Sequence, residues 1–156
     1  MNAPASNTAF EQLRTLRVDQ NGSLVAPAWL TEAFTQFAAG SISEDRLREL
    51  HALGVRGVRF NLVSPAGNRL EGFEAIAAKV EPLGWHVQFL VAPRELAEVA
   101  ALRERVRVPF VLDHLGGLTG DLAPDGEHER RVLALLARGD CWVKLSGFYF
   151  GGSFMW

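Results

Sequence analysis

The sequence predicts an α/β protein built on a parallel β-sheet. Short apolar runs of the kind found in buried strands alternate with longer segments whose apolar residues recur at helical spacing. The alternation occurs four times, and successive strands are separated by roughly 25 to 32 residues, the length of a βαβ unit. Four such units imply one parallel sheet whose crossover connections are right-handed.

The first unit has a well-marked helix start. Ser43 can accept hydrogen bonds from the free backbone N–H groups of the first turn. Ile42 and Leu47 stand at the positions of a hydrophobic staple, which fixes how the chain enters a helix. Gly54 can end this helix with a positive φ angle, and a strand is predicted over residues 55–61.

The next three units repeat this order of helix, stop and strand. Apolar residues recur at helical spacing over residues 73–83, 96–100 and 132–136. Gly84 and Gly139 are placed to end the first and the third of these helices. The strands that follow the three helices are predicted over residues 85–91, 109–114 and 142–147.

The composition of the 156-residue chain is that of an ordinary globular protein, with 48% hydrophobic and 22% charged residues. Its formal net charge of −2 gives no general attraction to nucleic acid or to an anionic membrane, so neither is an expected partner. The single cysteine, Cys141, excludes an internal disulfide, and no apolar run approaches the roughly 18 to 20 residues of a membrane span. The first residues lack the pattern of a secretory signal, so a cytoplasmic location is expected.

Polar residues gather at the C-terminal ends of the predicted strands. Parallel sheets place their chemistry at these ends. A polar side chain there costs stability unless it is paired or lies in a wet cleft, so the clustering predicts a site at this edge. The residues concerned are Arg59, Asn61, Gln88, Asp113, His114, Lys144 and Ser146.

Four segments around the predicted strands carry a family resemblance. Residues 54–61 read Gly-Val-Arg-Gly-Val-Arg-Phe-Asn, and residues 84–88 read Gly-Trp-His-Val-Gln. Residues 111–116 read Val-Leu-Asp-His-Leu-Gly, and residues 142–147 read Trp-Val-Lys-Leu-Ser-Gly. In order and in spacing, the four together resemble the amidohydrolase-related family of the amidohydrolase superfamily, in the branch that includes 2-pyrone-4,6-dicarboxylate lactonase. The resemblance extends over residues 42–149.

The resemblance implies a fold as well as a function. The fold is a partial (β/α)8 TIM barrel of the metal-dependent hydrolase type, formed by about four consecutive βα units. Residues 41–156 would form this partial barrel domain and supply about its third to sixth strands. Residues 1–40, with a turn expected at Asn21-Gly22 and a short helix over residues 29–39, remain an unassigned N-terminal segment.

The implied activity is that of a hydrolase acting on a small carboxylated lactone or a related cyclic carbonyl. His114 matches the family's fifth-strand histidine and is the expected catalytic residue, or a metal ligand if a metal is used. Arg59 is expected to bind a substrate carboxylate through two parallel hydrogen bonds, with Asn61 beside it. The cofactor is left open between a divalent metal such as zinc and none.

Two features of the family pattern do not occur in this sequence. The four histidines include no His-x-His pair, and the Trp-Gly-Thr-Asp-Trp-Pro-His segment that carries the family's catalytic aspartate is absent. Since a complete barrel has roughly 250 residues, we expect the hydrolase to be incomplete as this chain. The alternative is a truncated, catalytically inactive barrel fragment with at most a binding or oligomerising role. Unpaired outer strands would allow self-association through the sheet edges.

Several polar residues also have plain structural interpretations. Asp113 and His114 are adjacent, so on a strand they would point to opposite faces; we expect His114 to face the barrel interior and Asp113 to anchor a neighbouring loop or helix. Lys144 is expected in an ion pair, with an acid or base role as the alternative. His86 is expected to pack on its strand, and His128 to lie on a solvated helix face.

Overall fold

The computed structural model describes residues 17–18, 24–25, 32–33, 35–37, 40–64, 69–118 and 125–147. The chain divides into two compact units, residues 1–56 and residues 57–156, and each is described by itself. The turn predicted at Asn21-Gly22 lies outside the described residues. So does most of the helix predicted over residues 29–39, of which the described residues 32–33 and 35–37 are helical.

The first unit contains a small antiparallel ladder and one well-defined helix. Strand β1 (Arg17–Val18) pairs with β2 (Leu24–Val25), and helix α3 spans Glu44–Ala52. The predicted helix start is confirmed, because the Ser43 hydroxyl accepts a hydrogen bond of 3.1 Å from the Arg46 backbone N–H. Gly54 follows the helix with a φ of +98°, a conformation that glycine adopts without a Cβ clash.

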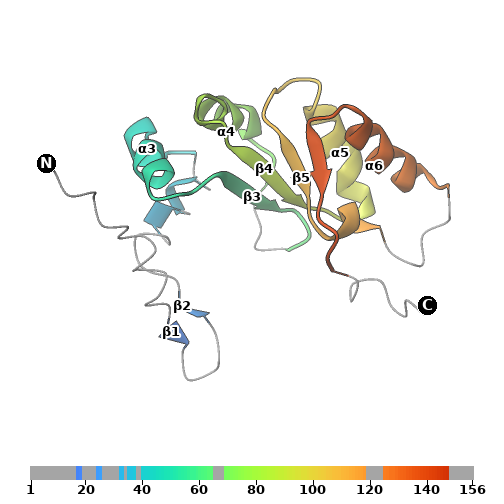
Figure 1. Ribbon diagram of the computed structural model, residues 1–156, viewed down its shortest axis with the longest axis horizontal. Coiled ribbons are helices and arrows are strands. Elements are labelled where there is room, and N and C mark those ends of the chain that lie inside the picture. The colour runs from blue at the N-terminus through green and yellow to red at the C-terminus, as the bar shows by residue number, and fades with distance from the viewer. Residues whose placement is uncertain are drawn as a thin grey trace, which may run out of the picture. The chain divides into compact units, whose positions relative to one another are not determined.

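The second unit is a parallel four-stranded sheet with helical crossovers, which confirms the predicted fold class (Figure 1). The strands are paired in chain order, β3-β4-β5-β6. They span Gly57–Asn61 (β3), His86–Leu90 (β4), Phe110–Leu112 (β5) and Cys141–Val143 (β6). The connections contain α4 (Phe73–Val80) with the 3₁₀ turn η1 (Glu81–Leu83), α5 (Pro93–Leu102), the 3₁₀ turn η2 (His114–Gly117) and α6 (Glu127–Ala137).

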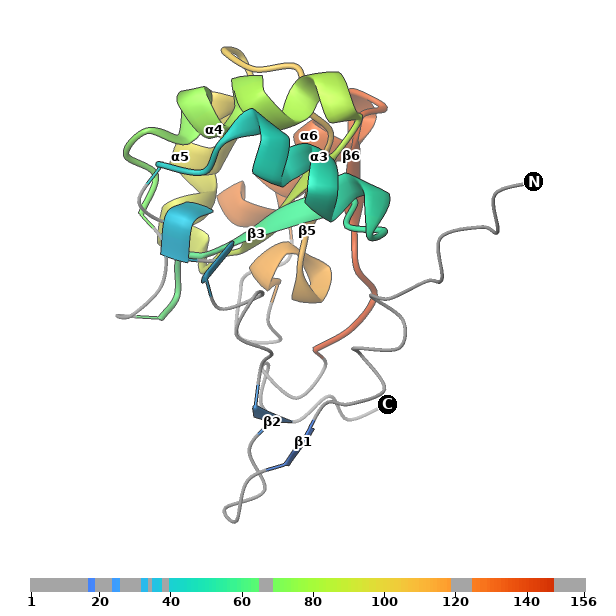
Figure 2. The ribbon, with the colours of Figure 1, turned by 90° about the vertical axis from the view of Figure 1, so that its left-hand side faces the viewer.

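Helices α4, α5 and α6 gather on one side of the strands (Figure 2). Because side chains alternate along a strand, every second residue faces this layer, and most of these residues are buried. Phe60, Phe89 and Phe110 come from three adjacent strands and surround Phe73 of α4, with ring centroids 5.4, 5.6 and 6.1 Å from the Phe73 ring. Each aromatic pair contributes about 0.5–1.5 kcal/mol beyond the area that it buries. This cluster forms the core that holds the sheet rigid.

None of the described helices combines the length and the apolar character that a membrane crossing requires.

The two C-terminal strands are shorter than the sequence predicts. Strand β5 ends at Leu112 instead of residue 114, and β6 ends at Val143 instead of residue 147. Beyond these points the two backbones leave strand geometry and bond to each other: the Leu115 N–H donates to the Lys144 carbonyl at 2.9 Å. The residues after Leu112 and Val143 therefore form the rim of the sheet.

The other face of the sheet, which we call the open face, carries the alternate strand residues. It includes Gly57, Arg59, His86, Gln88, Val111 and Trp142. The His86 ring lies over Gly57, where an added Cβ would come within 2.6 Å of it, so glycine leaves the space that the ring occupies. The expectation that His86 packs on its strand is confirmed.

Strand β6 is the outer strand on the C-terminal side of the sheet, and it exposes apolar side chains. Among the described residues no strand pairs with its outer edge. Trp142 is exposed, and Leu145 is 85% exposed. Because an unpaired, apolar edge favours pairing with another chain, we expect concentration-dependent association.

Sedimentation velocity over a range of concentrations measures this association. Replacing Leu145 by lysine adds a charge at the edge and removes an apolar side chain whose burial contributes about 1.5–3 kcal/mol. The L145K variant should therefore dissociate at roughly tenfold or higher concentration than the parent chain. A parent chain that stays monomeric at every concentration would contradict the prediction.

Candidate functional site

A buried carboxylate organises the open face near the C-terminal ends of the strands. Asp113, whose side chain has 0% exposure, accepts hydrogen bonds from three side chains that come from different parts of the same sheet. Arg59 Nε lies 2.8 Å from Oδ2, Lys144 Nζ lies 2.8 Å from Oδ1, and Gln88 Nε2 lies 2.9 and 2.8 Å from the two oxygens. We call these four residues the Asp113 cluster.

Strand register explains why four residues so far apart in sequence meet. Arg59 of β3 pairs with Gln88 of β4, and Gln88 pairs with Val111 of β5. All three point to the open face, and Asp113 follows two residues after Val111 on the same face. Lys144 likewise follows two residues after Trp142, the partner of Val111. The parallel sheet therefore brings two strand residues, Arg59 and Gln88, to the same place as Asp113 and Lys144, which directly follow β5 and β6.

The charge of the cluster is fixed by its hydrogen bonds. Burial raises the pKa of Asp113, but hydrogen bonds from Lys144, Gln88 and Arg59, together with the Arg59 charge, outweigh burial and bring the pKa below its usual range. The carboxylate therefore stays ionised and holds its donors in place.

Both cations of the cluster remain accessible from the open face. The side chains of Arg59 and Lys144 are 45% and 47% exposed. Arg59 bonds Asp113 through Nε, and within the described residues its terminal nitrogens Nη1 and Nη2 have no hydrogen-bond partner. An anion that approaches the open face would meet two positive groups whose positions Asp113 has already set.

The sequence predicts that Asp113 anchors a neighbouring loop or helix. This prediction is wrong, because Asp113 points to the open face of the sheet. Phe110 and Leu112 face the helices and are buried there, so the two-residue alternation places Val111 and Asp113 on the open face. His114 is not on a strand at all. It opens η2 with a φ of +49°, and this left-handed turn brings it to the rim.

His114 is held against the end of β6. Its Nδ1 lies 3.1 Å from the Ser146 hydroxyl oxygen. Its ring packs on Gly147, where any Cβ would overlap the imidazole, so this position requires glycine. The conformation of His114 is therefore fixed from two sides. Its role in catalysis stays a prediction.

Asn61, expected beside Arg59 at the substrate, has a structural partner. Its Oδ1 accepts a hydrogen bond of 3.2 Å from the Ser64 backbone N–H and so shapes the turn after β3. Substrate binding by Asn61 stays a prediction.

The described residues do not by themselves form a metal site. Over residues 40–64, 69–118 and 125–147, no group of three or more His, Cys, Asp or Glu side chains is placed to hold an ion. His114, the expected ligand, has its Nδ1 engaged by Ser146.

His128 lies in the interior and not on a solvated helix face, so that expectation is wrong. It is 7% exposed, and its Nε2 lies 2.8 Å from the Gly116 carbonyl oxygen. The sequence did contain a signal: His128 stands four residues before Val132 and seven before Leu135, the buried stripe of α6. The charged residues next to His128 in the sequence indicate a solvated face, and they conflict with this apolar spacing.

We expect His128 to make the folded chain less stable in acid. Burial lowers its pKa, the Gly116 hydrogen bond raises it and the Arg131 charge lowers it, with a net shift below the usual value. Protons therefore bind preferentially to the unfolded chain. The free energy of unfolding should be unaffected above about pH 6.5 and should fall progressively below it. In urea unfolding at several pH values, H128Q should remove part of this fall; an identical fall in both proteins would refute the assignment.

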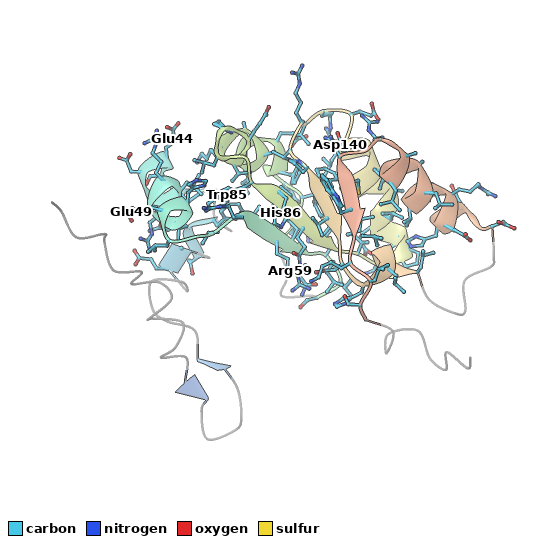
Figure 3. All side chains as sticks on the ribbon, in the orientation of Figure 1. Glu44, Glu49, Arg59, Trp85, His86 and Asp140 are labelled. Carbon is cyan, nitrogen blue, oxygen red and sulfur yellow. The ribbon has the colours of Figure 1, made fainter. Side chains whose placement is uncertain are left out.

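The opposite end of the sheet has a purely structural ion pair, which the sequence did not reveal. Arg103 at the end of α5 is buried and bonds both carboxylate oxygens of Asp140, and its guanidinium lies 5.2 Å from the Phe110 ring centroid. Figure 3 labels Asp140 at this end and Arg59 toward the other. Next to Asp140, burial raises the pKa of the Cys141 thiol to about 11, which disfavours a nucleophilic thiolate.

A separate hollow of about 440 Å³ lies beside α4 and α5. Acidic and basic side chains line it, among them Glu74, Glu95 and Arg105, and neither the Asp113 cluster nor His114 takes part. The polar groups of the candidate site, which are the Asp113 cluster and His114, lie instead on the open face and its rim.

Comparisons with known proteins agree on one family. The model of the family described as amidohydrolase matches residues 4–154. A 2-pyrone-4,6-dicarboxylate hydrolase from Comamonas testosteroni is 37% identical over 113 residues, which are 68% of this chain and 36% of that protein. The chain thus spans little more than a third of the curated relative that it matches.

Solved structures give the same result. A probable 2-pyrone-4,6-dicarboxylic acid hydrolase from Acinetobacter baumannii, crystallised with citric acid bound, is similar with a TM-score of 0.61 and 27% identity. The match covers 70% of this chain and 42% of that one. A protein of similar name from Pseudomonas putida matches with a TM-score of 0.63 and 27% identity, over 72% of this chain and 42% of its own.

Proposed function

Because the chain belongs to the amidohydrolase family, we propose that it forms part of a hydrolase that acts on a small carboxylated lactone or a related cyclic carbonyl. The observation that carries this proposal is the Asp113 cluster, which holds two half-exposed cations at the C-terminal ends of parallel strands. The named relatives act on a pyrone dicarboxylate, a ring lactone with two carboxylates.

Arg59 is the proposed carboxylate-binding residue. With Nε fixed on Asp113, its Nη1 and Nη2 can donate two hydrogen bonds to the oxygens of a substrate carboxylate. Lys144, also fixed on Asp113, adds a second positive charge near it. Because both cations are held before the substrate arrives, little side-chain entropy is lost on binding.

His114 is the proposed electrophilic residue. If Ser146 donates its hydroxyl hydrogen to Nδ1, the neutral imidazole has its proton on Nε2. When water attacks the lactone carbonyl carbon, negative charge develops on the carbonyl oxygen, and the Nε2–H can donate to it. The ring C–O bond then breaks. One proton of the attacking water ends on the ring oxygen, which becomes a hydroxyl group, and the other is released to solvent as the new acid ionises to a carboxylate. Asp113, engaged by three donors, has the role of an organiser and not of a base.

An assay of the 156-residue chain with 2-pyrone-4,6-dicarboxylate, with and without added zinc or manganese, tests the proposal. Since removal of one donor to a developing oxyanion typically reduces kcat by about 100- to 1000-fold, H114Q should show a loss of this size. H86Q is the matched control, because His86 lies on the same sheet but packs on Gly57. It should keep its rate within about threefold. An equal loss of rate in both variants, or no loss in H114Q, would contradict the electrophilic role proposed for His114.

The alternative proposal is an inactive barrel fragment that binds but does not turn over. The share of the relative that the chain spans, 36%, favours it. Saturable binding of the dicarboxylate without hydrolysis under any metal condition would establish this alternative, and turnover above background would exclude it.

A further inference from the structure

We propose that His128 of α6 is a positioning residue that fixes the loop from which His114 emerges. The importance of His114 rests on the function proposed above, whereas the contact between His128 and the loop does not. In this proposal a side chain from the helix layer determines where a rim residue of the sheet points.

The loop adopts an unfavourable backbone conformation. Residues His114, Leu115, Gly116 and Gly117 have successive φ angles of +49°, +56°, +68° and +76°. Glycine tolerates this left-handed region, but His114 and Leu115 have a Cβ that crowds the backbone there. Such residues keep this conformation only where the surroundings impose it. Contacts with the surrounding structure must therefore hold His114 and Leu115 in the left-handed conformation.

Backbone contacts fix the loop along part of its length. The Leu115 N–H donates to the Lys144 carbonyl, and the Gly116 N–H donates to the Asp113 carbonyl, each at 2.9 Å. Gly117 passes so close to the chain that an added Cβ would lie 2.6 Å from the Val91 carbonyl oxygen. These contacts involve N–H groups of the loop and the close approach of Gly117 to Val91, directly after β4. None of these three contacts involves the Gly116 carbonyl oxygen.

His128 holds that carbonyl. Its Nε2–H donates to the Gly116 oxygen at 2.8 Å, which is a good hydrogen-bond distance. The bond joins the first turn of α6 directly to the middle of the left-handed stretch, two residues from His114.

The other ring nitrogen of His128, Nδ1, supports a positioning role instead of a purely stabilising one. Nδ1 is buried and, among the described residues, has no hydrogen-bond partner. An unsatisfied buried nitrogen destabilises the fold, and an apolar residue would fill the same stripe of α6 without that cost. Such a local conflict is expected where a residue serves a site instead of stability.

The consequence is a chain of contacts from α6 to the rim. His128 holds Gly116, the held loop keeps His114 at positive φ, and His114 then lies on Gly147 with Nδ1 at Ser146. Without the His128 bond, the loop can relax toward an ordinary negative φ. The His114 ring would then leave Gly147.

Proton NMR of the 156-residue chain with isotope-labelled histidine tests this contact without substrate. The readout is the nuclear Overhauser effect between the His114 ring protons and the Gly147 Hα protons. H128L removes the donor, whereas H128Q keeps an amide donor near the position of Nε2. We expect the effect to weaken at least about fivefold in H128L and to persist in H128Q. L135A, which shortens a buried side chain on the same stripe, is the control and should keep it.

An intact effect in folded H128L, or an equal loss in L135A, would overturn the proposal. Should H128L fail to fold, H128N replaces it, because the shorter asparagine amide cannot reach Gly116 and must lose the effect that H128Q retains. The readout needs no activity. An intact contact in a parent chain that hydrolyses nothing would refute the proposed function of His114 alone. A lost contact in an H128L variant that still hydrolyses the substrate would confirm the positioning role and refute the function of His114, whereas an intact contact in H128L would refute the positioning role alone.

Discussion

The double substitution R59M/K144M should destabilise the folded chain by about 3–5 kcal/mol. It removes both cations from Asp113 and leaves a carboxylate with no solvent exposure and Gln88 as its remaining donor. A buried charge without a counter-charge is costly because the protein interior screens it poorly. Urea unfolding measures the change in the free energy of unfolding.

Three further variants make this prediction specific. Each single substitution, R59M or K144M, leaves one cation on Asp113 and should cost less than half as much. The triple variant R59M/K144M/D113L replaces the whole charged group by apolar side chains. It should recover most of the lost stability, because replacing every member of a buried ion pair by apolar residues is often neutral or stabilising. A double variant within about 1 kcal/mol of the parent would show that Asp113 is not held as described.

The second large effect is expected on ligand affinity. R59M should weaken the binding of 2-pyrone-4,6-dicarboxylate by roughly 30- to 150-fold, because two charge-assisted hydrogen bonds to a carboxylate contribute about 2–3 kcal/mol together. Asp113 keeps Lys144 and Gln88 in this variant, so the fold should survive. Isothermal titration calorimetry gives the dissociation constant directly.

Arg56 provides the matched control for Arg59. It lies three residues earlier, is exposed, and donates to the His51 and Val55 carbonyls at 2.6 and 2.8 Å instead of to the Asp113 cluster. R56M should change the dissociation constant by less than about threefold. If both substitutions weaken binding equally, the ligand responds to general positive charge and not to a clamp at Arg59.

Local patterns predicted most of the fold correctly because they depend on neighbouring residues. Ser43 caps α3 as expected, and four apolar runs became four parallel strands in chain order. Strands β5 and β6 end earlier than predicted. The turn after Leu112 depends on a hydrogen bond between the backbones of Leu115 and Lys144, which are far apart in sequence.

The site was predicted less well than the fold. Sequence placed Arg59, Asp113 and Lys144 near one edge but could not show that they form one cluster, since their meeting depends on strand register. The alternation of the apolar residues Phe110 and Leu112, which face the helices, does indicate that Val111 and Asp113 point to the open face. The bond of His128 to a left-handed loop follows from tertiary structure alone.

We propose that the open face, with Arg59 held by Asp113 and His114 at the rim, receives a carboxylated ring. Titration of the 156-residue chain with 2-pyrone-4,6-dicarboxylate, followed by NMR of arginine Nε–Hε and histidine ring signals, tests it most directly. We predict saturable shifts of the Arg59 and His114 signals. Saturable shifts at Arg69 and Arg105, beside the hollow at α4 and α5, with none at Arg59, would contradict it.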